Sequence, residues 1–103
     1  MTTYEFLNSL TEIAPLFQWR VTNHTLMLRG IFNETQYCPI TAVCYKLLGK
    51  DYSIASWPRA AKELSLTEPD AREIVFSADR IYLPKYCLVR KQLFTAVGMT
   101  VSD

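Results

Sequence analysis

The chain has 103 residues, half of them hydrophobic and only three of them glycine, so residues 1–103 are expected to fold as one packed domain rather than a disordered chain. Eleven basic and ten acidic residues leave a formal net charge of +1. Proteins that hold phosphate backbones through overall charge are usually far more basic, and nucleic-acid mimics are strongly acidic, so the composition disfavours both classes.

The sequence predicts a soluble protein with no membrane partner. No stretch approaches the roughly 20 apolar residues that span a bilayer, and the N-terminus lacks the basic and apolar regions of a signal peptide. Three cysteines are an odd number for a secreted disulfide scaffold. We therefore expect a cytoplasmic location, where thiols stay reduced.

The first predicted helix begins at a capping box formed by Thr2 and Glu5. Apolar residues then recur at helical spacing as far as Phe17, and Pro15 is expected to bend or end the helix. From residue 18 to residue 31 the apolar period changes to two, which predicts a β-hairpin. Four apolar residues are expected on its helix-facing side, namely Trp19, Val21, Leu26 and Leu28.

Residues 32–38 are predicted to form a loop, and Pro39 suits the first turn of the helix that follows. That helix is expected to end at Gly49 in a left-handed conformation. Three further helices are expected, with Ser56 and Thr67 as caps of the first two, Pro84 at the start of the third and Gly98 at its end.

The predicted fold class is therefore mainly α (α+β), a single compact domain of about five short helices with one β-hairpin near residues 18–31. A hairpin alone is marginal in water, so its apolar face should lie against the helices. Residues expected to be nearly inaccessible include Val43, Leu47, Ile74 and Leu93.

Residues 60–75 have the spacing of a helix-turn-helix, with Ala61 in the first helix, Ser65 in place of the usual turn glycine and Ile74 in the second helix. A DNA-reading helix presents its first turns to base edges flanked by phosphates. Here those turns carry three acids against one base, namely Glu68, Asp70 and Glu73 against Arg72. The favoured interpretation is two short helices packed for stability, with nucleic-acid binding, there or through the basic last helix, as the alternative.

Cys38 is the candidate reactive thiol, because a cysteine at a helix N-terminus can have a lowered pKa. A thiol nucleophile also needs a base, and the one histidine, His24, lies on the predicted hairpin turn with no pattern that brings it near. Cys38 and Cys44 are six residues apart rather than the two to four of a typical zinc site, and Cys87 and His24 lie on other predicted elements. We expect no catalytic residue, metal or cofactor, and keep a thiol enzyme or redox switch at Cys38 as a second alternative.

Four residues are the candidates for a binding surface. Tyr45 and Phe76 fall beside the polar sides of their predicted helices, and aromatic residues are enriched at interface centres. Arg90 and Lys91 belong to the basic last helix and are expected on its solvated face. The leading hypothesis is a non-catalytic protein–protein interaction module, for example an accessory protein or an inhibitor of a host or defence enzyme. The identity of the partner protein and the oligomeric state stay open.

The order of these features resembles that of small bacterial and phage proteins. The residues that carry the resemblance are the Trp19 hairpin with Arg29, the run Cys38-Pro39-Ile40-Thr41-Ala42-Val43, Ile74-Val75 with Ala78-Asp79, and the basic last helix that ends at Gly98. The resemblance implies a prokaryotic or viral cytosolic origin and carries over no activity.

Overall fold

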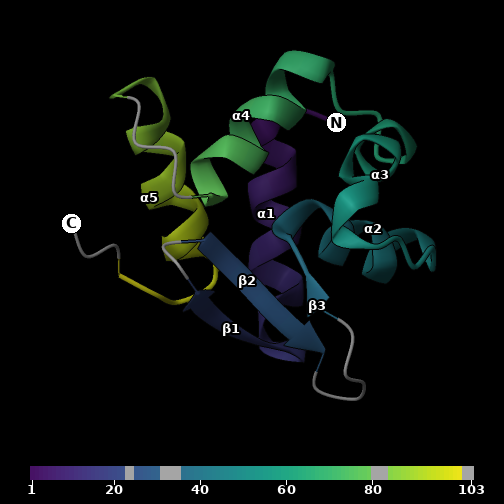
Figure 1. Ribbon diagram of the computed structural model, residues 1–103, viewed down its shortest axis with the longest axis horizontal. Helices are drawn as coiled ribbons and strands as arrows, with labels where there is room; N and C mark the ends of the chain where they lie inside the picture. Colours follow the sequence, from purple (N-terminus) through teal and green to yellow (C-terminus); the bar gives the residue numbers. More distant parts are fainter. Residues whose placement is uncertain (23–24, 31–35, 80–83, 101–103) are drawn as a thin grey trace.

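The computed structural model describes residues 1–22, 25–30, 36–79 and 84–100, and it confirms a mainly helical α+β fold. In chain order the elements are α1 (Thr3–Ile13), η1 (Ala14–Leu16), β1 (Phe17–Thr22), β2 (Thr25–Gly30), β3 (Gln36–Tyr37), α2 (Pro39–Leu48), η2 (Ile54–Ser56), α3 (Trp57–Glu63), α4 (Glu68–Ala78), η3 (Pro84–Tyr86) and α5 (Cys87–Ala96). Helix α1 stands in the middle of the molecule, with α5 on one side, α2 on the other and the hairpin beside its C-terminal end (Figure 1).

The predicted capping box of α1 is present. The Thr2 hydroxyl accepts a hydrogen bond from the Glu5 amide at 3.1 Å, and the Thr2 amide donates to the Glu5 carboxylate at 2.9 Å. Pro15 ends the α-helix as expected, since Ala14–Leu16 form a single 3₁₀ turn that leads into β1. The capping box therefore defines where this central helix begins, and the proline where it ends.

Strands β1 and β2 form the predicted antiparallel hairpin. Val21 pairs with Leu26 and Trp19 pairs with Leu28, which is the register expected from the alternation of apolar residues. Leu26 is fully buried and Trp19 is half-buried against the core, whereas Val21 is 41% exposed near the end of the strand. The structure does not describe the side chain of Leu28, so its predicted orientation is not tested. Ile31 and the predicted turn residue His24 also lie outside the described part of the chain.

The prediction of a loop over residues 32–38 is wrong for Gln36–Tyr37, which form a third strand antiparallel to β2. Residues 32–35 lie outside the described part of the chain. Tyr37 is fully buried, and its ring centroid lies 5.7 Å from that of Phe17 and 5.4 Å from that of Tyr45. A strand of two residues is too short for an apolar period to be detected in the sequence. Tyr37 is buried because β3 pairs with β2 and is covered by α2.

Helix α2 begins at Pro39 and is closed by Gly49, whose φ of 67° is the expected left-handed conformation. Its first six residues, 39–44, are all buried. Leu47 is 46% exposed, so the prediction that it belongs to the core is wrong. The apolar stripe continues to the last turn of α2, where both Leu47 and Leu48 are largely exposed, so that turn is not covered by the core.

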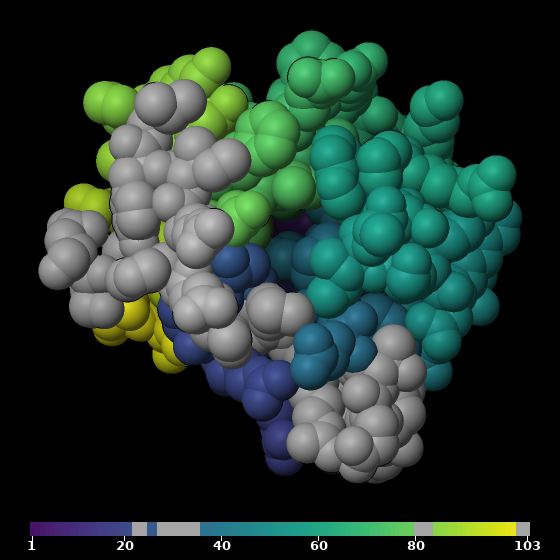
Figure 2. Space-filling model, viewed as in Figure 1, coloured from purple at the N-terminus to yellow at the C-terminus, as the bar shows by residue number. Residues whose placement is uncertain are grey.

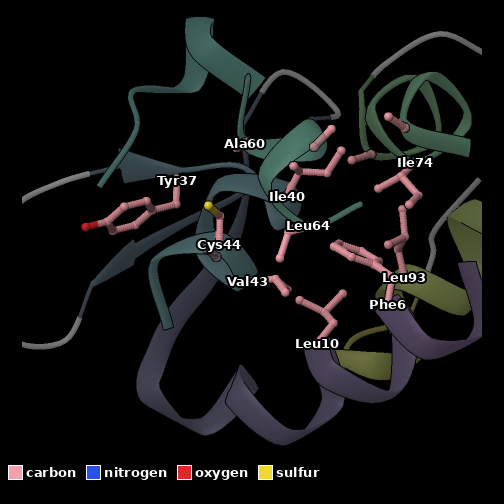
Figure 3. Packing of buried hydrophobic residues seen from close by; sticks show 14 of the residues in the cluster. Phe6, Leu10, Tyr37, Ile40, Val43, Cys44, Ala60, Leu64, Ile74 and Leu93 are labelled. Carbon is pink, nitrogen blue, oxygen red and sulfur yellow. The ribbon is translucent and has the colours of Figure 1, made fainter. Parts of the chain in front are cut away.

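The remaining helices follow their sequence signals. Thr67 accepts a hydrogen bond from the Asp70 amide at 3.3 Å and so caps α4, while Ser56 occupies the N-cap position of α3 without a side-chain capping bond. Pro84 opens a 3₁₀ turn that precedes α5, and Gly98 adopts a φ of 80° after it. The core side chains converge from every helix, and the expected burial of Val43, Ile74 and Leu93 is confirmed (Figure 3).

Two leucine variants test this assignment of the core. We expect Leu93→Ala to lower the free energy of unfolding by about 2–5 kcal/mol, because it leaves a cavity at a fully buried site. Leu47→Ala should cost less than about 1 kcal/mol, because its side chain is half exposed. Urea denaturation of both variants measures the difference, and equal losses would contradict the placement of Leu47 outside the core.

Candidate functional site

Helices α3 and α4 are joined by a tight turn, a geometry that both interpretations of residues 60–75 predict. Ser65 has a φ of 58°, the left-handed conformation that glycine usually supplies at this position. Leu64 and Leu66, on either side of it, are buried, and the ammonium group of Met1 donates to the Ser65 carbonyl at 2.8 Å. The two buried leucines therefore anchor the turn between the two helices in the core.

A groove of about 550 Å³ lies between α3 and α4. The buried side chains of Ala61, Leu66 and Ala71 form its floor, and the half-buried rings of Trp57 and Phe76 form its walls. The exposed rim comprises Pro58, Lys62, Glu68 and Arg72. The space-filling view shows the surface hollowed between the green atoms of α4 and the teal atoms that precede it (Figure 2). The two alanines at the floor leave room between the two large aromatic rings, and such an apolar hollow is typical of a site for an apolar side chain.

Two of the three charged residues on the rim form an ion pair, and the third does not. Arg72 Nη2 lies 2.7 Å from Glu68 Oε1, one turn earlier on α4, so these two charges compensate each other. Lys62 is exposed on the opposite helix, and no acidic partner for it occurs among the described residues. The groove therefore carries an excess of one positive charge at its α3 edge.

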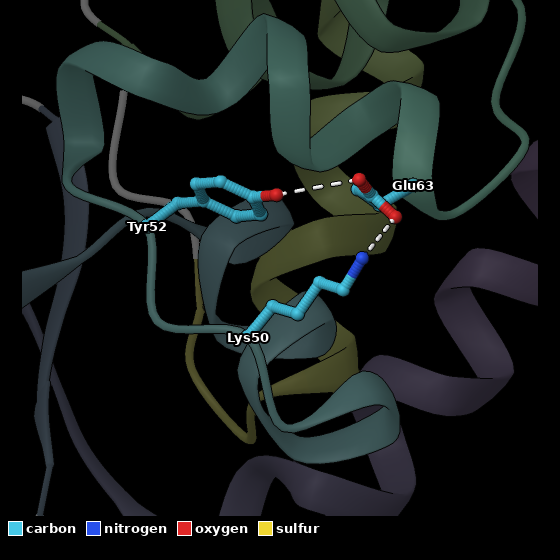
Figure 4. Close-up of polar contacts among 3 residues, drawn as sticks. All are labelled: Lys50, Tyr52 and Glu63. Atoms are coloured by element: carbon cyan, nitrogen blue, oxygen red, sulfur yellow. Dashed lines mark hydrogen bonds and ion pairs between the residues drawn. The ribbon is translucent and has the colours of Figure 1, made fainter.

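Glu63, the residue that follows Lys62, is engaged elsewhere. Its carboxylate accepts a hydrogen bond from Lys50 Nζ at 2.7 Å and another from the Tyr52 hydroxyl at 3.3 Å (Figure 4). The hydrogen bond from Lys50 lowers the pKa of Glu63, and the same contact raises the pKa of Lys50. This cluster ties the segment after α2 to α3 and keeps the Glu63 charge satisfied.

Of the four predicted binding residues, only Phe76 lines the groove. Its ring packs edge-on against Tyr86 at a centroid distance of 5.9 Å, and Lys85 Nζ lies 5.0 Å from the Tyr86 ring centroid. Trp57, Leu66 and Lys62 were not predicted as site residues. The available signal was the pair of short helices around Ser65, with a tryptophan at the start of the first.

Tyr45 does not join Phe76. It is half-buried on α2, where its ring stacks at a tilt of 32° on the buried Tyr37. Tyr37 in turn contacts Phe17, and Phe17 contacts Trp19 at 6.0 Å, so four aromatic rings form one row over the sheet. Tyr45 therefore has a packing role that the helical pattern of α2 alone did not indicate.

Arg90 is a correction to the predicted surface, because it is only 7% exposed. Its Nη1 atom donates to the carbonyl of Ser77 at 2.9 Å and to that of Asp79 at 2.7 Å, and its guanidinium carbon lies 4.7 Å from the Phe94 ring centroid. A cation at the C-terminus of α4 satisfies carbonyl groups that have no partner within the helix and complements its dipole. Lys91, the next residue, is exposed as predicted.

Cys38 occupies the N-cap of α2, as the position of Pro39 predicted. The Thr41 hydroxyl accepts from the Cys38 amide at 3.0 Å and lies 3.5 Å from Cys38 Sγ. Burial raises the pKa of the Cys38 thiol, and this effect exceeds the opposing effect of its hydrogen bonds with Thr41. The structure therefore indicates a raised pKa, not the lowered one that a helix N-terminus can produce. His24, the one histidine considered as a base for this thiol, lies outside the described residues.

No family model, curated protein or solved structure matches the chain. In the part of the chain that the structure describes, no helix combines the length and apolar character needed to cross a membrane. Within the same residues, no three histidine, cysteine or acidic side chains gather into a potential metal site. The candidate site is the α3–α4 groove, on the ground of its apolar lining between Trp57 and Phe76.

The role of Arg90 can be tested against its neighbour. Arg90→Met should lower the free energy of unfolding by roughly 1.5–3 kcal/mol, because it removes charge-assisted hydrogen bonds and leaves buried carbonyls unpaired. Lys91→Met removes the same charge from an exposed site and should change stability by less than about 0.5 kcal/mol. Chemical denaturation of both variants provides the comparison, and an Arg90 variant as stable as the wild type would return that residue to the surface.

The raised pKa of Cys38 predicts how its thiol behaves with pH. Because the folded pKa lies above the ordinary value of 9.0, the thiol stabilises the fold below that pH, and this contribution is lost as the pH rises through the folded pKa. Cys38→Ser should therefore reduce the fall in unfolding free energy at alkaline pH, as chemical denaturation of both proteins over a range of pH would show.

The exposure of the thiols predicts the order in which they react. At neutral pH, iodoacetamide should modify exposed Cys87 before Cys38, as mass spectrometry of digested protein would show. Faster modification of Cys38 would favour a thiol mechanism.

Proposed function

We propose that the protein is a non-catalytic protein–protein interaction module and that a segment of its partner binds in the α3–α4 groove. The observation that carries the proposal is an apolar floor at Leu66 between the half-buried rings of Trp57 and Phe76, open to solvent on a rigid pair of helices. Buried aromatic anchors in pockets contribute most of the binding energy at protein interfaces.

The shape of the groove supports a protein partner. Two helices with an apolar channel between them form the kind of surface that receives apolar side chains from a helical or extended segment. The turn at Ser65 is flanked by the buried side chains of Leu64 and Leu66, which anchor both helices of the groove in the core. A site on anchored helices loses little conformational entropy on binding.

Two alternatives are less well supported. In a helix-turn-helix reading, the first turns of α4 would meet phosphates with Glu68 and Asp70, and its Arg72 is already paired with Glu68. A thiol enzyme would need an activated nucleophile, whereas burial raises the pKa of Cys38. An accessory or inhibitory role in the cytoplasm requires only a binding surface of the kind described.

The proposal is tested by selecting binders from a random peptide library displayed on phage, with the folded protein as bait. We expect selected peptides to lose at least about tenfold in affinity for Phe76→Ser, because the variant removes one wall of the groove. Trp57→Gln removes the other wall of the groove and should cause a similar loss, so it replaces Phe76→Ser in the test if that variant unfolds. Tyr4→Ser removes an aromatic ring that is 74% exposed outside the groove and should leave binding unchanged.

Fluorescence anisotropy with the selected peptides measures these affinities, and thermal unfolding confirms that each variant is folded. Peptides that bind both groove variants as tightly as the wild type would contradict the proposal. So would failure to select any peptide while oligonucleotides bind with a steep dependence on salt concentration, which indicates phosphate contacts.

A further inference from the structure

We infer that the groove takes an acidic segment of the partner, in which a large apolar side chain enters the floor and a neighbouring carboxylate pairs with Lys62. This inference rests on the proposed function and adds the chemical class of the ligand. It is carried by the placement of one uncompensated cation beside an apolar groove.

The charges around the groove lead to this assignment. Among its lining residues, Glu68 and Arg72 neutralise each other at 2.7 Å, which leaves the charge of Lys62 in excess. Glu63, the acid nearest to Lys62 in the chain, is bound by Lys50 at 2.7 Å and by the Tyr52 hydroxyl at 3.3 Å. Arg59 precedes Lys62 by three residues on α3, but it lies outside the lining of the groove, and its charge contributes to lowering the pKa of Glu63.

A basic or neutral apolar segment fits the same groove less well. An ammonium or guanidinium group on the ligand would be repelled by Lys62 and would have to displace Arg72 to reach Glu68. A neutral segment would leave Lys62 without a counter-charge beside a surface that binding removes from water. An acidic segment meets neither cost, so electrostatic complementarity selects it.

A phosphate backbone is a poorer match than a carboxylate peptide. A phosphate backbone repeats a negative charge at every unit, whereas the lining of the groove offers one uncompensated cation, Lys62. The walls at Trp57 and Phe76 enclose apolar floor residues, which suits one anchoring side chain with one nearby charge. The ligand class is therefore an acidic, apolar peptide segment.

Charge reversal at the rim provides the test, with the phage library repeated on each protein. Peptides selected on the wild type should place Asp or Glu close to a Trp, Phe or Leu residue. Lys62→Glu should bind these peptides at least about tenfold more weakly and should itself select peptides with Lys or Arg at the same position. Lys62→Gln should give a smaller loss without the inversion. Lys91→Glu makes the same charge change on exposed α5 and should behave as the wild type.

The outcomes separate this inference from the proposed function. Peptides that depend on Phe76 but carry no acidic preference, or that bind Lys62→Glu as well as the wild type, overturn the inference and leave the groove as the binding site. Oligonucleotide binding that Lys62→Glu abolishes overturns it as well. If no selected peptide depends on Phe76, the proposed function fails and the inference fails with it.

Discussion

The position of α4 depends on the guanidinium group of Arg90, which reaches from α5 to the carbonyls at the C-terminal end of α4. The same end of α4 is tied to the sheet, because the Asp79 carboxylate accepts a hydrogen bond of 2.6 Å from the Thr25 hydroxyl of β2. Two helices and a strand thus meet at Asp79. A charge-assisted contact in this low-dielectric location is stronger than one at the surface and costly to remove.

The contacts at the C-terminal end of α4 help to determine the geometry of the groove. Helix α4 supplies Phe76 and Ala71, and its two ends are held separately, the C-terminal end by Arg90 and the N-terminal end by the turn at Ser65. With both ends fixed, the wall formed by α4 keeps its distance from Trp57 on α3. The polar cluster of Lys50 and Glu63 holds α3 in the same way from the other side.

Much of the candidate site could not be predicted from the chain. Phe76 was predicted because it is an aromatic residue that falls off the apolar stripe of its helix. Arg90 was predicted to be exposed because it is a cation on the polar side of its helix, but it is buried. A helical pattern gives the angle of a residue around its own axis and says nothing about which neighbour covers that angle. Arg90 precedes Leu93 and Phe94 by one turn and therefore lies on the same face of α5. That face packs against α4, which buries Arg90 together with the two apolar residues.

The sequence by itself determined the local structure: the Thr2–Glu5 capping box and Pro39 set helix starts, Gly49 and Gly98 set helix ends, and the change of period set the hairpin and its register. These signals act through bonds between residues a few positions apart, so they are present in the chain before it folds. Only the tertiary structure decided that Tyr37 is core, that Leu47 is exposed and that Lys62 faces a groove with its charge uncompensated. Those outcomes depend on how distant elements cover one another, because burial and charge pairing are properties of the packed molecule rather than of any segment.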